Sequence, residues 1–247
     1  MISVCILTKN AGATLRETLE SVKTFPEVVV VDNGSTDETK KIASEYGNVK
    51  WFEREFIGFG KLRNEAGKLA TNDWILAVDA DEVVTDELLR EIGGLHKDPE
   101  VAYSMPRNNY YNHKHIRGCG WYPDRVVRLY HRKHNQYSPT QVHESIAAKQ
   151  VVPFTSPLKH TPFRTTAEFL AKMQHYSTLF AQQHAGQKKS STSKAFFHSL
   201  FAFFRSYFLQ GGWKLGAEGF TISLYNSNSV YYKYLKLSEV NKLIQID

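Results

Sequence analysis

Three carboxylates stand within four positions at the end of an apolar stretch of the chain. The run "ILAVDADE" at positions 75–82 ends in Asp79, Asp81 and Glu82. Like charges this close repel one another, and burying them is costly unless a positive charge lies nearby. The sequence has no lysine or arginine at positions 74–89, so it predicts that either water or a bound cation balances the cluster.

Asp79 and Asp81 are two positions apart, which in an extended backbone places both side chains on the same side. Mg²⁺ or Mn²⁺ accepts one or two protein carboxylates and takes the rest of its coordination shell from water and substrate phosphates. The pair therefore predicts that the missing positive charge arrives with the substrate, as a metal–diphosphate. An acidic helix start is the alternative, because Thr85, Asp86 and Glu87 follow. The position directly after a buried strand favours the metal.

A second polar cluster, "VVVVDNGSTDET", follows a β-branched run. Asp32 ends that run, and Gly34 permits tight backbone near a ligand. A turn into a helix with Ser35 or Thr36 as its N-cap is expected here. The cap accounts for Ser35, Thr36 and Asp37 but does not require an acid at position 32. The carboxylate of Asp32 can accept hydrogen bonds from a nucleobase N–H or a ribose hydroxyl.

The first hundred residues alternate between strand and helix patterns. Strands are expected at 3–7, 27–32, 49–54 and 73–79, and helices at 14–23, 35–47 and 61–70. This alternation with short links predicts an α/β domain with a mainly parallel sheet. Ligands of such sheets bind beyond the carboxyl ends of the strands. The polar strand ends at 8–10, 32–35 and 79–82 are therefore expected to meet at one edge and form a site.

The rest of the chain has two different patterns. Positions 103–163 carry short aromatic and basic segments with Gly and Pro between them, which predict antiparallel strands and loops on the acceptor side. The chain is expected to be helical from Thr166 onward. Within it, "AFFHSLFAFFRSYFL" at 195–209 holds six phenylalanines. Basic residues lie in or beside this stretch: Lys188, Lys189, Lys194 and Arg205. The pattern suits either a helix in a membrane interface or a core or dimer helix.

Composition narrows the class of protein. The 247 residues are 42% hydrophobic and 23% charged, which is typical of a globular protein. The net charge of +6 favours anionic partners such as nucleotides, nucleic acid or anionic lipid. Cys5 and Cys119 form no disulfide framework, and Cys5, inside an apolar run, is expected to be a buried inert thiol. With neither a signal-peptide pattern nor a membrane-spanning apolar run, a cytoplasmic protein is expected, and attachment to a membrane surface stays open.

Several of these segments together resemble family 2 glycosyltransferases with the GT-A fold. They are "ILTKNAG", "VVVVDNGSTDET", "GKLRNEAGKLATNDWILAVDADE" and "GWYPDRVVRLY" followed by "VHES". The branch that is most similar builds the inner core of bacterial lipopolysaccharide or lipooligosaccharide, usually as β-glucosyltransferases. The resemblance implies a GT-A-type nucleotide-sugar-binding domain with a mainly parallel central sheet at 1–165. Its donor half would be 1–100 and its acceptor-side half 101–165, and 166–247 would form a helical C-terminal region.

The resemblance also implies which residues contact the donor. They are Thr8, Lys9, Asn10, Asp32, Asn33, Ser35, Lys61, Arg63, Asn64 and Asp79. Asp32 would hold uracil, and Asp79 would face the ribose and the sugar. Asp81 would bind Mg²⁺ or Mn²⁺, with Asp79 and His160 as further candidate ligands. Independently of the resemblance, Lys61 and Arg63 are cations that could offset diphosphate charge, although a solvated helix face explains Lys61 equally well.

An inverting transferase needs a general base within about 3 Å of the acceptor hydroxyl. Glu144 in "QVHES" is favoured, because the resembling enzymes carry a similar His-Glu after a strand. Asp124 in "GWYPDRVVR" is the alternative base, or an acceptor contact paired with Arg125.

The leading hypothesis is an inverting, metal-dependent transfer of a sugar, glucose first, from a UDP-sugar to a lipid-linked oligosaccharide acceptor. The acceptor would lie at the inner face of the cytoplasmic membrane, where the basic aromatic C-terminal region would meet lipid phosphates. Alternatives are transfer to a protein or another glycan, a catalytically inactive fold used for assembly, and a basic nucleic-acid-binding module. Nucleic acid is not the expected partner, because the acidic edge at 79–82 would repel its phosphates. A homo-oligomer stays open.

Overall fold

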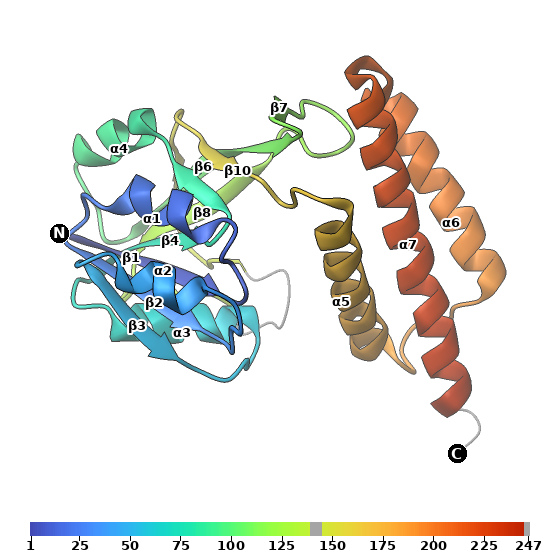
Figure 1. Ribbon diagram of the computed structural model, residues 1–247, viewed down its shortest axis with the longest axis horizontal. Coiled ribbons are helices and arrows are strands. Elements are labelled where there is room, and N and C mark those ends of the chain that lie inside the picture. Colours follow the sequence, from blue (N-terminus) through green and yellow to red (C-terminus); the bar gives the residue numbers. More distant parts are fainter. Residues whose placement is uncertain (139–144, 245–247) are drawn as a thin grey trace. The chain divides into compact units, whose positions relative to one another are not determined.

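The computed structural model describes residues 1–138 and 145–244 (Figure 1). Glu144, the predicted general base, lies outside the described residues. The chain forms two compact units, each described by itself below. The first unit comprises residues 1–108 and 124–160, and the second comprises 109–123 and the chain from 161 onward.

The first unit is built on a sheet whose strands run in the order β3-β2-β1-β4-β8-β6-β10-β5. Four neighbouring strands are parallel: β3 (Val49–Glu53), β2 (Glu27–Asp32), β1 (Ile2–Thr8) and β4 (Trp74–Asp79). β8 (Arg125–His131) joins them antiparallel to β4, and β6 (Val101–Tyr111) pairs antiparallel with β8. The short strands of this unit are β5 (Glu82–Val84), β9 (Gln150–Pro153) and β10 (Leu158–His160). A further short strand, β7 (Lys114–His115), belongs to the second unit and pairs with Tyr110 and Tyr111 at the end of β6.

Helices cover both faces of the parallel strands, which explains their unbroken apolar sequences. The helices of this unit are α1 (Leu15–Val22), α2 (Thr39–Ser44), α3 (Phe59–Leu69) and α4 (Asp86–Gly93). On one face, Val28 and Val30 of β2 join a core cluster with Leu15 and Leu19 of α1. On the other face, the alternate side chains of β2 pack with Leu62 of α3. The predicted α/β fold is confirmed. The sheet is mixed, because its four neighbouring parallel strands are extended by the antiparallel strands β8 and β6.

Two local expectations differ from the structure. The helix expected at 35–47 covers only Thr39–Ser44, and its N-cap is Glu38, which makes no side-chain cap. The prediction of Ser35 or Thr36 as N-cap is wrong, because both residues bond to the ends of β1 and β2 instead. In the acceptor-side region, β6 and β8 are antiparallel as expected, but β9 runs parallel to β6.

The second unit is mainly helical, as predicted. It contains α5 (Thr166–His184), α6 (Thr192–Phe204), the π-helical turn η1 (Arg205–Leu209), the 3-10 turn η2 (Gly212–Leu215) and α7 (Ala217–Ile244). Both α5 and α6 pack along α7 (Figure 1). Among the described residues, no helix combines the length and the apolar character that crossing a bilayer requires.

An aromatic cluster forms the core of the second unit. Phe169 of α5 stacks on Tyr225 of α7 with ring centroids 3.8 Å apart, and Phe163 packs against both rings. Gly219 lets α7 pass η2 closely, because a Cβ at that position would lie 1.9 Å from the Gly212 carbonyl oxygen. The phenylalanines of 195–209 take little part in this core. Five of the six are exposed, so the core interpretation of that stretch is wrong.

Candidate functional site

The three polar strand ends of the first unit meet at one edge of the sheet. In the strand register, Thr8 of β1 lies beside Asp32 of β2, and Leu7 lies beside Asp79 of β4. Thr8, Asp32 and Asp79 are the last residues of their strands, and Leu7 is the residue before the end of β1. The expectation that positions 8–10, 32–35 and 79–82 share one edge is therefore confirmed.

Asp32 is buried and organises the loop after β2. Its Oδ2 accepts hydrogen bonds from the backbone N–H groups of Gly34 at 3.1 Å and Ser35 at 2.9 Å, and its Oδ1 accepts from the Ser35 hydroxyl. A carboxylate offers about four acceptor positions, so room for a further donor remains on Oδ1. Gly34 has a φ of +95°, a conformation that favours glycine.

The loop after β1 is tied to the loop after β2. Asn10 has a left-handed backbone with φ of 52°, its N–H donates to Ser35 Oγ at 2.8 Å, and its Oδ1 accepts from Thr36 N–H at 2.8 Å. Thr8 is buried, and its Oγ1 has no hydrogen-bond partner among the described residues. The side chain of Lys9 is exposed. Thr8, Asn10, Asp32 and Ser35 thus form one connected arrangement.

Asp79 is balanced by arginines that are distant in sequence. Its Oδ1 accepts a hydrogen bond from Arg63 of α3, and its Oδ2 accepts one from Arg128 of β8. The Nη1 atom of Arg107 in β6 lies 4.0 Å from Asp79 Oδ2. Burial by itself would raise the pKa of Asp79, but the charges of Arg128 and Arg63 outweigh it and hold that pKa well below its usual range. Asp79 is therefore ionised, with both oxygens engaged.

Glu82 shares the same arginines and is completely buried. Its Oε1 accepts from Arg128 at 2.7 Å and from Arg107 at 3.3 Å. Its Oε2 accepts from the backbone N–H of Asp79 at 2.9 Å and so closes the turn after β4. The prediction that water or a bound cation balances the cluster is wrong for Asp79 and Glu82, because guanidinium groups from β6, β8 and α3 supply the positive charge.

Asp124 belongs to this network through Arg107. Its Oδ2 accepts from Arg107 Nε at 2.8 Å, and its carbonyl accepts from the Arg107 N–H at 2.9 Å. The predicted pairing of Asp124 with Arg125 is wrong, because Arg125 donates instead to the carbonyl oxygens of Ser104 and Phe154. Alternation along β8 explains this outcome, since neighbouring residues of a strand point to opposite faces.

Asp81 lies next to His160. Oδ1 of Asp81 and Nε2 of His160 are 3.5 Å apart. His160 ends β10 and pairs with Glu82 of β5 across the two strands, which places the imidazole beside the turn after β4. In the described part of the chain, no cluster of three His, Cys, Asp or Glu could hold a metal ion. The pair fits Mg²⁺ or Mn²⁺ when substrate phosphates and water complete the shell.

The three predicted residues of α3 have different surroundings. Arg63 is buried against Asp79, and Lys61 is exposed. Asn64 uses its amide on the backbone of Tyr137: its Nδ2 donates to the Tyr137 carbonyl, and its Oδ1 accepts from the Tyr137 N–H, both at 2.9 Å. The Tyr137 ring in turn lies 5.3 Å from the Arg63 guanidinium. Asn64 is therefore engaged within the protein, whereas Lys61 faces solvent.

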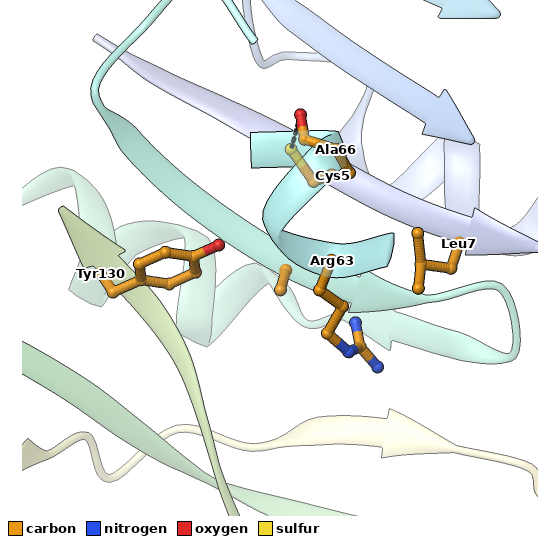
Figure 2. A pocket seen from close by; sticks show the side chains of 6 residues that line it. Cys5, Leu7, Arg63, Ala66 and Tyr130 are labelled. Atoms are coloured by element: carbon orange, nitrogen blue, oxygen red, sulfur yellow. Dashed lines mark hydrogen bonds between the residues drawn. The ribbon is translucent and has the colours of Figure 1, made fainter. Parts of the chain in front are cut away.

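The far side of Arg63 borders a small gap in the core. Figure 2 shows Arg63 with Cys5, Leu7, Ala66 and Tyr130 around it. The Cys5 thiol donates to the Ala66 carbonyl at 3.5 Å, and burial raises the pKa of Cys5 to about 12. Cys5 is thus buried, as predicted, and it is protonated at neutral pH.

Sequence reasoning missed Arg107, Arg128 and the structural role of Glu82. One signal was present for Arg128, because "RVVRLY" places a cation inside a strand of otherwise apolar and aromatic residues. A strand-centre arginine is rarely buried without a partner. Its partners are 46 and 49 residues away in the chain, and no local pattern indicates them.

Comparisons with known proteins identify the family of this chain. The profile of glycosyl transferase family 2 matches residues 3–153. The lipopolysaccharide core biosynthesis glycosyltransferase LpsC of Rhizobium meliloti is 31% identical over 89% of this chain and 85% of its own length. An uncharacterized glycosyltransferase of Rickettsia felis is 28% identical over 96% of this chain and 89% of its own length. The crystal structure of S. aureus TarS 1-349 in complex with UDP-GlcNAc aligns with a TM-score of 0.49 and 15% identity, covering 99% of this chain and 91% of that one.

A glycosyltransferase is the class that the family profile and these relatives define. This chain belongs to glycosyl transferase family 2 and is a glycosyltransferase. Its α/β unit has the GT-A type of fold that the sequence motifs implied.

Proposed function

We propose that this chain is an inverting, metal-dependent transferase that moves a sugar, glucose first, from a UDP-sugar to a lipopolysaccharide core acceptor. The meeting of Asp32, Asp79 and Asp81 at one sheet edge is the observation that carries the proposal. The identity to LpsC over most of both chains supports the acceptor class. The proposal places the protein in the cytoplasm, at the inner face of the cytoplasmic membrane, where such an acceptor is lipid-linked.

The nucleoside would bind at the ends of β1 and β2. Asp32 is fixed by three hydrogen bonds from its own loop, which orients its carboxylate before any ligand arrives. The remaining acceptor position on Oδ1 suits the N–H of uracil. The unpartnered hydroxyl of Thr8, together with Lys9, Asn10, Asn33 and Ser35, would complete this side of the pocket.

Asp81 and His160 would hold the Mg²⁺ or Mn²⁺ ion. The metal, when bound, would neutralise the charge that develops on the leaving diphosphate. Asp79 stays a prediction as a second ligand, and a metal there would compete with two arginines for its oxygens. The arginine-held Asp79 suits contacts to the ribose and the sugar, because its position is fixed by α3 and β8. Lys61 would contact the diphosphate from the exposed face of α3. Arg63 and Asn64 would support the donor site from within the protein, through Asp79 and the Tyr137 backbone.

The proton of the acceptor hydroxyl would pass to a carboxylate. Glu144 stays the proposed base, and Asp124 stays the alternative. Asp124 is engaged by Arg107 at 2.8 Å, so its use as a base would require that ion pair to loosen. Glu144→Gln and Asp124→Asn should therefore differ: the true base variant loses turnover much more than donor affinity.

Thermal unfolding with UDP, GDP, CDP and dTDP, each with and without Mn²⁺, tests the donor class. A ligand at a hundred times its Kd adds about 2.7 kcal/mol, which for this chain length raises Tm by roughly 5–10 °C. The expected result is a shift for UDP that requires Mn²⁺. A shift for another nucleotide would mean that the donor carries a different nucleobase from uracil. No shift with any nucleotide would contradict the proposed donor site.

Asp81→Asn tests the metal assignment. Transfer should fall by at least about 100-fold and the Mn²⁺-dependent shift with UDP should disappear, because the amide is a poor ligand for a hard cation. Asp86→Asn is the matched control: the same substitution five positions on, at an exposed site in the first turn of α4, should leave both readouts unchanged. Near-normal turnover of Asp81→Asn would show that the metal assignment is wrong.

The acceptor needs its own test, since the fold could also serve transfer to a protein or another glycan. Radiolabelled UDP-glucose incubated with a lipopolysaccharide core acceptor should give labelled glycolipid. Label in protein or in a free glycan alone would assign a different acceptor and leave the donor site intact.

A further inference from the structure

We propose that the aromatic face of α6, η1 and η2 docks on an anionic lipid surface. We define the aromatic face by its exposed members: Phe196, Phe197, Leu200, Phe201, Phe204, Phe208, Leu209 and Trp213. This inference rests on the second unit alone and does not depend on the chemistry proposed for the strand-end site.

The exposure of this face is the first observation. Phe197 is 65% exposed and Phe201 is 61% exposed. Single exposed apolar residues are ordinary, but contiguous large apolar patches on soluble proteins mark interaction sites. Residues separated by three or four positions share one side of a helix, so the members on α6 form a continuous stripe.

The opposite side of α6 carries small residues and packs inward. Ala195 and Ser199 of α6 and Ser206 of η1 are buried. The Ser199 carbonyl accepts a hydrogen bond from the Ser227 hydroxyl of α7 at 2.9 Å, and Ser206 hydrogen-bonds with Ser223 at 3.0 Å. Small residues therefore let α6 approach α7 closely. Phe203 of α6 and Tyr207 of η1 pack on Phe220 of α7, whereas the members of the aromatic face are directed outward.

Charge identifies the partner. Between Glu168 and Glu218 the sequence has no Asp or Glu, although it has five lysines and one arginine. Among these, Arg205 at the start of η1 is exposed, and the ammonium group of Lys214 lies 5.3 Å from the Trp213 ring. Two copies of this face would bring like charges together, whereas an anionic lipid surface supplies the opposite charge. A tryptophan beside a lysine at the rim suits the headgroup level of a bilayer.

The geometry fits an interfacial helix. α6 has 13 residues, which is about 20 Å of helix and too short to span a bilayer. A helix that lies in the interface plane buries only one face in the acyl boundary. The aromatic face meets that requirement, with basic side chains available to reach phosphates.

Flotation of the full chain with vesicles tests the proposal. Binding is expected to vesicles of phosphatidylglycerol and phosphatidylethanolamine, and to be weaker by at least tenfold with phosphatidylcholine alone. The double variant Phe197→Ser and Phe201→Ser should bind the anionic vesicles about tenfold more weakly for each ring removed. Leu243→Ser is the matched control, because Leu243 is 66% exposed at the end of α7 and lies outside the aromatic face. Its binding should stay within about twofold of the parent.

Two further measurements separate the contributions. Arg205→Gln with Lys214→Gln should weaken binding about fivefold for each charge, with anionic vesicles only. Quenching of Trp213 by brominated lipids should report insertion, and Trp213→Phe should remove most of that quenching while flotation persists.

Three outcomes would overturn the proposal. The parent chain may float with neither vesicle, or the double phenylalanine variant may float as the parent does. If sedimentation shows that the double variant converts a dimer to a monomer without affecting flotation, the face is an interface between copies. A large drop in Tm of the double variant would assign the face to packing within the chain.

Discussion

The strand-end network of the first unit and the aromatic face of the second unit both depart from the usual placement of side chains, but in opposite directions. The strand-end network consists of the carboxylates of Asp79 and Glu82 and the guanidinium groups that pair with them, from Arg63, Arg107 and Arg128. In the network, Glu82 is completely buried and Arg128 is 5% exposed. In the aromatic face, Phe197 and Phe201 are more than half exposed. Charged groups are inside in one region, and large apolar groups are outside in the other.

The two regions differ in whether the chain itself compensates for the unusual placement of these side chains. Each buried carboxylate of the network meets a guanidinium group within the chain, so the charges balance without any outside partner. The members of the aromatic face stay about half or more exposed, because the helix packs against α7 with its opposite side. The difference teaches where an outside partner is required: the buried charges of the network are balanced within the chain, whereas the exposed apolar side chains of the aromatic face are not covered by the chain itself.

Arg128→Met should give the largest effect on stability. It leaves Asp79 and Glu82 buried with much of their compensating charge removed, which costs about 3–5 kcal/mol of unfolding free energy. Urea unfolding measures the loss. The control is Arg90→Met, because Arg90 is 71% exposed and pairs with Glu87 on the surface of α4. That variant should change stability by less than about 0.5 kcal/mol.

A triple variant sharpens this test. Asp79→Asn and Glu82→Gln together with Arg128→Met should recover part of the lost stability, since the unpaired charges are removed as well. No recovery would show that Arg128 stabilises the sheet through packing and not through charge. A loss below about 1 kcal/mol in Arg128→Met would contradict the idea that the network is balanced internally.

A buried carboxylate away from the strand ends extends the comparison to acid pH. Glu27 is 5% exposed; burial raises its pKa, but hydrogen bonds from Lys50, Ser3 and Thr71 outweigh this and lower the pKa to about 2 from 4.5. Because the folded-state pKa is depressed, the stabilisation is fully present above pH 4.5 and is lost as the pH falls toward 2. The total is at most about 3 kcal/mol.

Glu27→Gln checks this linkage. The free energy of unfolding of the parent chain and the variant should differ most above pH 4.5, and the difference should shrink as the pH falls. Glu38→Gln serves as the control, because Glu38 is exposed and pairs only with Lys41 at 3.4 Å. A difference between parent and Glu27→Gln that does not change with pH would assign Glu27 a steric role.

The sequence predicted what depends on local pattern and missed what depends on distant partners. Periodicity located β1, β2, β4 and α3, and the rule for parallel sheets brought Asp32, Asp79 and Asp81 to one edge. The guanidinium groups of Arg63 and Arg128 come from elements 16 and 49 residues away from Asp79, and only the fold brings them there. The helix start at Thr39 was missed for the same reason, because Ser35 and Asn10 satisfy each other across two loops.

The exposed phenylalanines illustrate the converse limit. Helical periodicity in 195–209 is weak because aromatic residues occupy most positions, so the pattern left the core and interface interpretations equal. The buried side is marked by Ala195, Ser199 and Ser206, and small residues carry little weight in a hydrophobicity pattern. Packing against α7 leaves most of the phenylalanines exposed and so excludes the core interpretation, and packing is a property of the folded unit.

Phe201→Ser should give the smallest effect on stability, and that small effect is informative. Phe201 is 61% exposed, so its removal in the absence of lipid should change the free energy of unfolding by no more than about 0.5 kcal/mol. Phe169→Ser is the matched control within the same unit: Phe169 is 7% exposed and stacks on Tyr225, so its loss should cost about 3–5 kcal/mol. Both values come from urea unfolding without lipid.

The same pair of variants should exchange their ranking when lipid is the readout. Phe201→Ser should bind anionic vesicles about tenfold more weakly while it stays as stable as the parent chain. Phe169→Ser, under conditions where it is folded, should keep vesicle binding. A cost above about 2 kcal/mol for Phe201→Ser would mean that Phe201 is already covered by protein. The aromatic face would then be a second internally balanced region, and the contrast with the strand-end network would disappear.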